Sequence, residues 1–175
     1  MTTTPDTLEL DVQLTERDYL LANYWYFFRN WSVRSLIPIA AILLGVSVFL
    51  WIRNPRGIPW MGLVLPAALV AILISVYFGS KRSMASNKSL QEPIHYRFSR
   101  DEIEAVASSS SGRTNWANIF AAHEAGRNFL IFISRNQMYT IPKRCFDREE
   151  QIASFRALLR DCLGERAHLR GVRHP

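Results

Sequence analysis

The sequence predicts an α+β membrane protein, in which a two-helix transmembrane hairpin is joined to a small antiparallel β module closed by a C-terminal helix. Residues 34–80 hold three basic and no acidic side chains and are strongly apolar. Residues 94–164 instead contain short runs of alternating apolar and polar residues, which are typical of strands. A length of 175 residues suits one small domain with an appendage, and two cysteines are too few for a disulfide scaffold.

The N-terminal part, residues 1–33, predicts a strand followed by a helix. Residues 8–14 alternate strictly between apolar and polar side chains. A single strand needs a partner, so we expect this one to complete the sheet of the later module. Thr15 and Asp18 have the spacing of a capping box and predict a helix over residues 16–30. The aromatic second half of that helix is typical of an interfacial helix at lipid headgroups.

Two charge-free runs, residues 36–52 and 58–80, predict the transmembrane hairpin over residues 34–80. Helices of these lengths would span about 26 Å and 34 Å, against roughly 30 Å for the hydrocarbon core. The connector, residues 53–57, contains proline and glycine and predicts a turn, so both termini lie on one side. Five Lys or Arg side chains precede or follow the hairpin and two lie in its connector, which favours cytoplasmic termini. The alternative, a buried hairpin of a soluble protein, is disfavoured by two such long runs in so short a chain.

Small side chains recur at every fourth position of the second run and share one helix face. Such a face lets another helix approach closely. We expect the two spans to pack on each other through it, while a homodimer is the alternative. Neither span carries an ionisable side chain in its core, which disfavours transport by this chain alone. The candidate helix-packing residues are Ala67, Ala71, Ser75 and Gly79.

The C-terminal part begins with a polar linker, residues 81–93, and continues into the β module. Residues 94–98 and 103–107 alternate as strands do, and the apolar run 129–133 predicts a strand covered on both faces. We expect five or six antiparallel strands in a small barrel-like sheet.

A helix closes this module. Asp147 and Glu150 have the spacing of an N-cap and N3 pair, and the amphipathic stretch after them ends at Gly164. Residues 165–175 form a basic tail that we expect to be frayed.

Several of these features together resemble a known family. They are Trp116-x-x-Ile119, the apolar strand 129–133, the stretch Ile141-Pro142-Lys143-Arg144, and Phe146 before a capped helix. In this combination they resemble the YcxB-like bacterial membrane proteins. The resemblance implies a multi-pass protein of the bacterial inner membrane, with a pleckstrin-homology-like (PH-like) module after two spans. It implies no activity and no catalytic residue.

Catalytic, cofactor and metal sites are not predicted. His123 and Glu124 are neighbours, but adjacent strand residues point to opposite faces, and no third ligand follows. Cys145 and Cys162 are not spaced as a redox pair or a zinc half-site. An enzyme with an unrecognised site would have to draw on His123, Glu124 and Cys145.

Basic side chains form the candidate interaction surface. Lys143, Arg144 and Arg148 cluster at the junction of strand and helix, and Lys81 and Arg82 lie beside the membrane. Near an anionic leaflet each such charge contributes about 1 kcal/mol. A simple solvated face is the alternative interpretation. Nucleic-acid binding is disfavoured because no base-stacking motif accompanies the charge.

The sequence therefore predicts a non-enzymatic module, anchored in the membrane, that binds a partner protein or anionic lipid headgroups at the cytoplasmic face. The alternative is an accessory or immunity-type subunit of a membrane complex, which would dock through its transmembrane helices. No cofactor is expected in either case.

Overall fold

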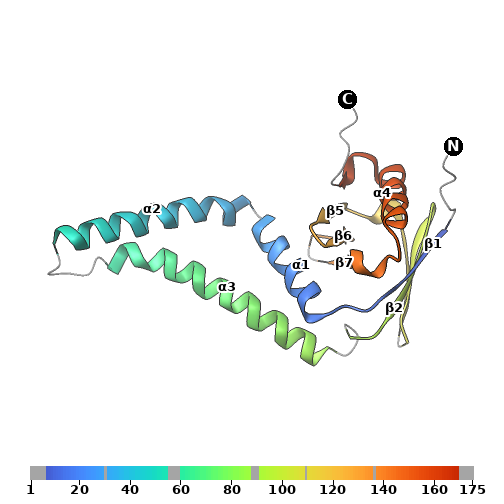
Figure 1. The fold of residues 1–175 in the computed structure, drawn as a ribbon, viewed down its shortest axis with the longest axis horizontal. Coiled ribbons are helices and arrows are strands. Elements are labelled where there is room, and N and C mark those ends of the chain that lie inside the picture. The colour runs from blue at the N-terminus through green and yellow to red at the C-terminus, as the bar shows by residue number, and fades with distance from the viewer. Residues whose placement is uncertain are drawn as a thin grey trace. The chain divides into compact units, whose positions relative to one another are not determined.

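A computed structural model describes residues 7–29, 31–54, 60–87, 91–108, 110–135 and 137–169. Residues 55–57 of the expected turn and residues 170–175 of the expected tail lie outside these ranges. The chain divides into a helical unit, Asn23–Ser83, and a β unit made of Met1–Ala22 and Met84–Pro175 (Figure 1). The β unit is therefore discontinuous in sequence, with the helical unit inserted into it.

The first sheet of the β unit contains the N-terminal strand. Its four antiparallel strands lie in the order β1 (Thr7–Val12), β2 (Ile94–Ser99), β3 (Glu102–Val106) and β4 (Ser111–Asn115). Leu8 lies opposite Phe98 and Leu10 opposite Tyr96, all four of them buried. The expectation that the first strand joins the later sheet is confirmed.

The second sheet has the order β7 (Met138–Pro142), β6 (Asn128–Phe132), β5 (Ala121–Ala125) and β8 (Ala167–His168). Strand β6 is buried at every position, as the apolar run predicted. Two expectations were wrong: the strands form two sheets rather than one, and β8 runs parallel to β5. Strand β8 also lies in the expected tail, and a strand of two residues is too short to leave a periodic pattern.

Helix α4 (Glu149–Leu163) closes the core between the two sheets. The ring centroid of Phe155 lies 4.8 Å from that of Phe98 in the first sheet and 5.1 Å from that of Phe129 in the second. All three side chains are fully buried. One helix side chain therefore packs against both sheets at once.

The two ends of α4 compare differently with the sequence prediction. Gly164 ends the helix with a φ of +55°, a conformation that glycine adopts at little cost. The expected Asp147 and Glu150 pair is wrong by one residue, because Arg148 occupies the N-cap position. The backbone N–H of Asp147 instead donates to the side-chain oxygen of Gln151, at 2.8 Å.

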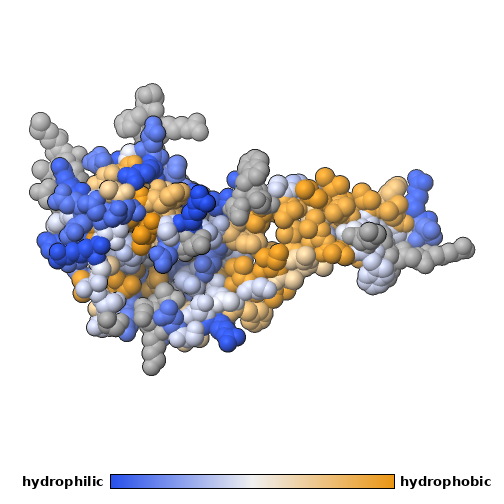
Figure 2. Space-filling model, turned by 180° about the vertical axis from the view of Figure 1, so that it is seen from behind, coloured by the Kyte–Doolittle hydropathy of each residue, from blue (hydrophilic) through white to orange (hydrophobic). Residues whose placement is uncertain are grey.

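The helical unit comprises most of α1 (Glu16–Arg29), with α2 (Trp31–Arg53) and α3 (Trp60–Ser86). Helix α3 therefore continues through the first part of the expected linker. Val33–Arg53 and Gly62–Ser86 are long and apolar enough to cross a membrane, and at most 11% of either apolar window is buried. Apolar residues accordingly cover much of the surface of these helices (Figure 2). Both windows are therefore mostly unburied within the described structure.

Helices α2 and α3 approach each other closely at Gly62, which the sequence pattern did not single out. A Cβ atom at this position would lie 1.8 Å from the hydroxyl oxygen of Ser47 and 3.2 Å from the carbonyl oxygen of Leu43. The small-residue face expected to pack on α2 is instead exposed in the structure at all four positions: Ala67, Ala71, Ser75 and Gly79. The expectation that this face packs the two helices together was therefore wrong.

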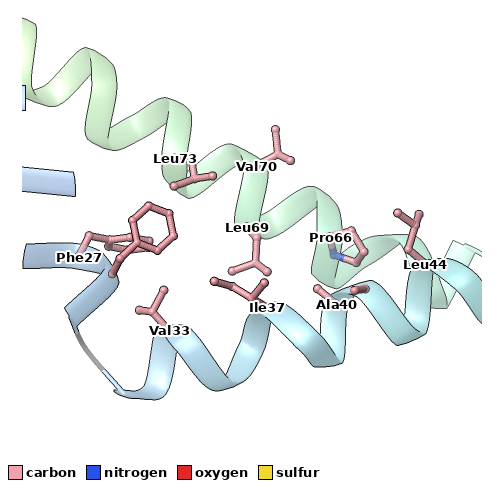
Figure 3. A pocket seen from close by; sticks show the side chains of 11 residues that line it. Phe27, Val33, Ile37, Ala40, Leu44, Pro66, Leu69, Val70 and Leu73 are labelled. Atoms are coloured by element: carbon pink, nitrogen blue, oxygen red, sulfur yellow. The ribbon is translucent and has the colours of Figure 1, made fainter. Parts of the chain in front are cut away.

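An apolar groove of about 330 Å³ lies among the three helices of this unit (Figure 3). Figure 3 shows Ile37 of α2 and Leu69 of α3 pointing toward one another within it. Beside the groove, the Tyr24 hydroxyl donates to the carbonyl oxygen of Leu73, at 3.1 Å. A hydrogen bond thus joins α1 to α3 beside a groove that is itself apolar.

Candidate anion-binding groove

A cavity of about 540 Å³ in the β unit brings together four cationic side chains and one carboxylate. Three segments form its walls: the start of α1, the turn between β5 and β6, and the end of β7 with the 3-10 turn after it. The lining residues are Thr15, Arg17, Asp18, Gly126, Arg127, Pro142, Lys143 and Arg144. Segments far apart in the sequence therefore build one basic site, which we call the basic groove.

The start of α1 is fixed by the predicted capping box. The Thr15 backbone N–H donates to Asp18 Oδ2 at 3.1 Å, and the Asp18 N–H donates to the Thr15 hydroxyl at 3.3 Å. The buried Asn128 side chain of β6 donates to the Asp18 carbonyl oxygen at 3.2 Å. These bonds dock the first turn of α1 on the second sheet, and so place Arg17 beside the groove.

The other two walls are held together by the backbone. Gly126, with a φ of +57°, makes the tight turn from β5 to β6 that sets Arg127 at the rim. The carbonyl oxygen of Arg127 then accepts a hydrogen bond of 2.8 Å from the backbone N–H of Lys143. This bond keeps the end of β7 against the turn.

The carboxylate in the groove is already paired. Arg144 Nη2 donates to Asp18 Oδ2 at 2.6 Å and to the Gln13 carbonyl oxygen at 2.6 Å. Burial opposes the ionisation of Asp18, but hydrogen bonds from Arg144 and Thr15 outweigh it and lower the pKa of Asp18. The hydrogen bond to Asp18 likewise raises the pKa of Arg144. The pair is therefore charged, and Asp18 is neutralised by its partner.

Lys143 connects the groove to a buried ion-pair cluster. It contacts Glu124, whose side chain is 1% exposed, and Glu124 also accepts from Arg156 Nη2 at 2.7 Å. The hydrogen bond to Glu124 raises the pKa of Arg156. Two cations share one buried carboxylate, so the cluster carries a net positive charge next to the cavity.

Arg17 and Arg127 are the groove residues that the sequence pattern missed. Both are exposed, and within the part of the chain that the structure describes neither forms an ion pair. Each is a single basic residue near a turn or a helix start, which is an ordinary surface feature. Only the folded structure brings them beside Lys143 and Arg144.

The remaining predicted basic residues lie elsewhere. Arg148 is exposed at the N-cap position of α4 and does not line the groove. Lys81 and Arg82 are exposed on α3 and belong to the helical unit. Of the five predicted interaction residues, the structure places Lys143 and Arg144 in one site.

His123 and Glu124, two of the side chains considered for catalysis, have different partners in the structure. The His123 ring stacks on that of His168 with centroids 4.5 Å apart, whereas Glu124 pairs with Lys143 and Arg156. Burial raises the pKa of the Cys145 thiol, which disfavours a nucleophilic thiolate. Among the described residues no three His, Cys, Asp or Glu side chains are grouped to hold a metal ion.

The comparisons with known proteins agree with the resemblance seen in the sequence. No curated protein and no solved structure matches the chain. The family model described as YcxB-like protein matches residues 98–159. This stretch runs from β2 into α4 and includes Arg127, Lys143 and Arg144 of the basic groove. The resemblance to this family is thus confirmed over residues 98–159, the stretch that the family model matches.

Proposed function

We propose that the protein is a two-span anchor of the bacterial inner membrane that holds a non-enzymatic, PH-like binding module at the cytoplasmic face. The module binds anionic lipid headgroups through the basic groove. The observation that carries this function is the meeting of Arg17 and Arg127, both without ion pairs among the described residues, with Lys143 and Arg144 in one cavity.

Membrane anchoring is supported by α2 and α3, whose apolar surfaces are barely buried within the described structure. Strand pairing adds a constraint on topology. Strand β1 precedes the hairpin and β2 follows it, and the two are hydrogen-bonded along their length. This pairing supports a topology in which both flanks of the hairpin lie on the same side of the membrane. The excess of Lys and Arg on these flanks favours the cytoplasmic side.

Lipid headgroups are favoured as the ligand because of where the groove lies along the chain. Arg17 is in the first turn of α1, a helix of 14 residues and about 21 Å that leads into the first apolar helix. The segment that carries Arg17 is therefore followed along the chain by the proposed span, which supports a ligand at the bilayer. Cations near an anionic leaflet contribute about 1 kcal/mol each to its attraction.

A non-enzymatic, PH-like module is supported by the arrangement of the β unit and by its site chemistry. Two packed sheets, antiparallel apart from the parallel pair of β5 and β8, are closed by a C-terminal helix and suit a PH-like fold. In the groove the one lining carboxylate is paired with Arg144, which leaves it poorly suited to act as a general base. Docking of the exposed small-residue face to a membrane complex remains the alternative prediction.

Cysteine labelling tests the topology. In a background with Cys145→Ser and Cys162→Ser, we introduce Asn54→Cys at the end of α2 or Ala153→Cys on α4, both exposed positions. In spheroplasts an impermeant maleimide should label Asn54→Cys, and should label Ala153→Cys only after permeabilisation. Labelling of Ala153→Cys in intact spheroplasts, or release of the protein by alkaline carbonate, would contradict the proposal.

Native mass spectrometry tests the ligand class. The full chain, purified in a neutral detergent, should retain phosphatidylglycerol in preference to phosphatidylcholine because the groove carries excess positive charge. The variant Arg17→Glu with Arg127→Glu should lose that preference. Equal retention of both lipids by the unaltered protein would remove the headgroup proposal, and binding of an acidic protein instead would favour the partner-protein alternative.

A further inference from the structure

We infer that the basic groove is specific for a phosphomonoester, a doubly charged phosphate group carried on a small organic body. This inference rests on the proposed function in taking the groove as the binding site. Arg17 and Arg127 hold the phosphate oxygens, while the cluster of Lys143 and Arg156 on Glu124 supplies one surplus positive charge behind them.

The charge of the site matches a dianion better than a monoanion. The Asp18 carboxylate is neutralised by Arg144, and Glu124 is shared by Lys143 and Arg156. Each pairing is made inside the protein, so neither carboxylate is available to balance Arg17 and Arg127. Two guanidinium charges remain at the rim and one surplus charge lies behind them. A phosphomonoester carries nearly two negative charges at neutral pH, whereas a phosphodiester carries one.

The chemistry of the rim also fits phosphate. A guanidinium group presents planar, paired N–H donors that match two oxygens of one phosphate. The turn at Gly126 is open, since a Cβ atom there would meet nothing within 4 Å. A ligand can therefore approach the turn beside Arg127 without a clash. The cavity, at about 540 Å³, is larger than a phosphate group needs and has room for a small organic body.

The shape of the site favours a compact anion over an extended acidic peptide. The cations come from three separate segments that converge on one cavity, rather than from a stripe along one helix or strand edge. Such convergence suits a ligand with its charge at one point. Two sources can supply the phosphomonoester: a lipid headgroup such as that of phosphatidic acid, or a soluble phosphate ester. The chemistry of recognition is the same for both.

The test compares monoester and diester lipids on the full chain. The protein is placed in nanodiscs of phosphatidylcholine alone, or of phosphatidylcholine containing either phosphatidic acid or phosphatidylglycerol. Binding of soluble glycerol 3-phosphate is titrated in each at pH 7.5. Glycerol 3-phosphate should bind in phosphatidylcholine nanodiscs, and phosphatidic acid should compete with it more strongly than phosphatidylglycerol. Arg17→Gln with Arg127→Gln should weaken glycerol 3-phosphate binding by about tenfold or more, because two charged hydrogen-bond donors are lost.

Arg135→Gln is the matched control. It makes the same Arg→Gln change, once, in the exposed loop between β6 and β7, at the opposite end of β6 from Arg127. Its affinity for glycerol 3-phosphate should stay within about twofold of the unaltered protein, as for a distant surface charge.

The outcomes separate this inference from the proposed function. Equal competition by the two lipids would overturn phosphomonoester specificity while leaving headgroup binding intact. Binding of glycerol 3-phosphate without competition from either lipid would support the phosphomonoester, assign a soluble source and contradict the headgroup function. Equal binding by the unaltered protein and the double variant, or no binding of glycerol 3-phosphate and no lipid preference, would overturn the inference.

Discussion

Glu124→Gln should destabilise the β unit by about 3 kcal/mol, because it removes the anion shared by two partly buried cations. The Glu124 side chain is 1% exposed, while those of Lys143 and Arg156 are 22% and 25% exposed. Glutamine keeps the shape of the side chain and its hydrogen-bonding oxygen but not its charge. The loss should be measured on the full chain in detergent, as reduced protection of the β5 and β6 amides in hydrogen exchange.

Glu104→Gln is the control for this experiment. Glu104 pairs with Arg113 on the first sheet, at 3.0 Å, and the Arg113 side chain is 68% exposed. An exposed pair of this kind contributes about 0–1 kcal/mol, so its removal should change protection little. If the two variants lost the same protection, the buried cluster around Glu124 would have no special role in stability.

Phe155→Ala should cost about 3–5 kcal/mol of stability, since it opens a cavity where α4 meets both sheets. The ring contacts Phe98, Phe129 and Phe146, with centroids 4.8, 5.1 and 5.4 Å away. Amide protection in β2 and β6 should fall together, because one side chain packs against both strands. Loss confined to α4 would contradict the view that Phe155 joins the two sheets.

Phe120→Ala provides the comparison for this substitution. Phe120 is 52% exposed, so the same truncation removes less buried surface. We expect an effect within about 0.5 kcal/mol, as for most surface substitutions. A cost close to that of Phe155→Ala would mean that the size of the deleted side chain, rather than its burial, sets the loss.

Much of the fold could be predicted because its strongest patterns are local. The alternation in β1 and the apolar run of β6 each follow from the side chains of a few consecutive residues. The pairing of β1 with β2 followed from the need of a single strand for a partner. Strand β8 escaped prediction because its two residues are held by packing against β5, which leaves no periodic signature in the sequence.

The site was predictable only where its residues are neighbours in the chain. Lys143 and Arg144 are adjacent and could be recognised as a basic cluster. Arg17 and Arg127 reach the same cavity through long-range contacts, above all the bond from Asn128 to the Asp18 carbonyl oxygen. The helix contact at Gly62 has the same origin, since close approach depends on which face meets α2 and not on the number of small residues in a stripe.

The first sheet joins strands that lie on either side of the helical unit in the sequence, and this affects its biosynthesis. Val12 of β1 pairs with Ile94 of β2, about 80 residues later. At translation rates of about 5–20 residues per second, the nascent first strand waits roughly 4–16 s before its neighbour is synthesised. Both apolar helices are synthesised during that interval, so their proposed insertion into the bilayer can begin before the sheet is complete. A chain that stalled between these events would expose an unpaired edge to quality-control proteases.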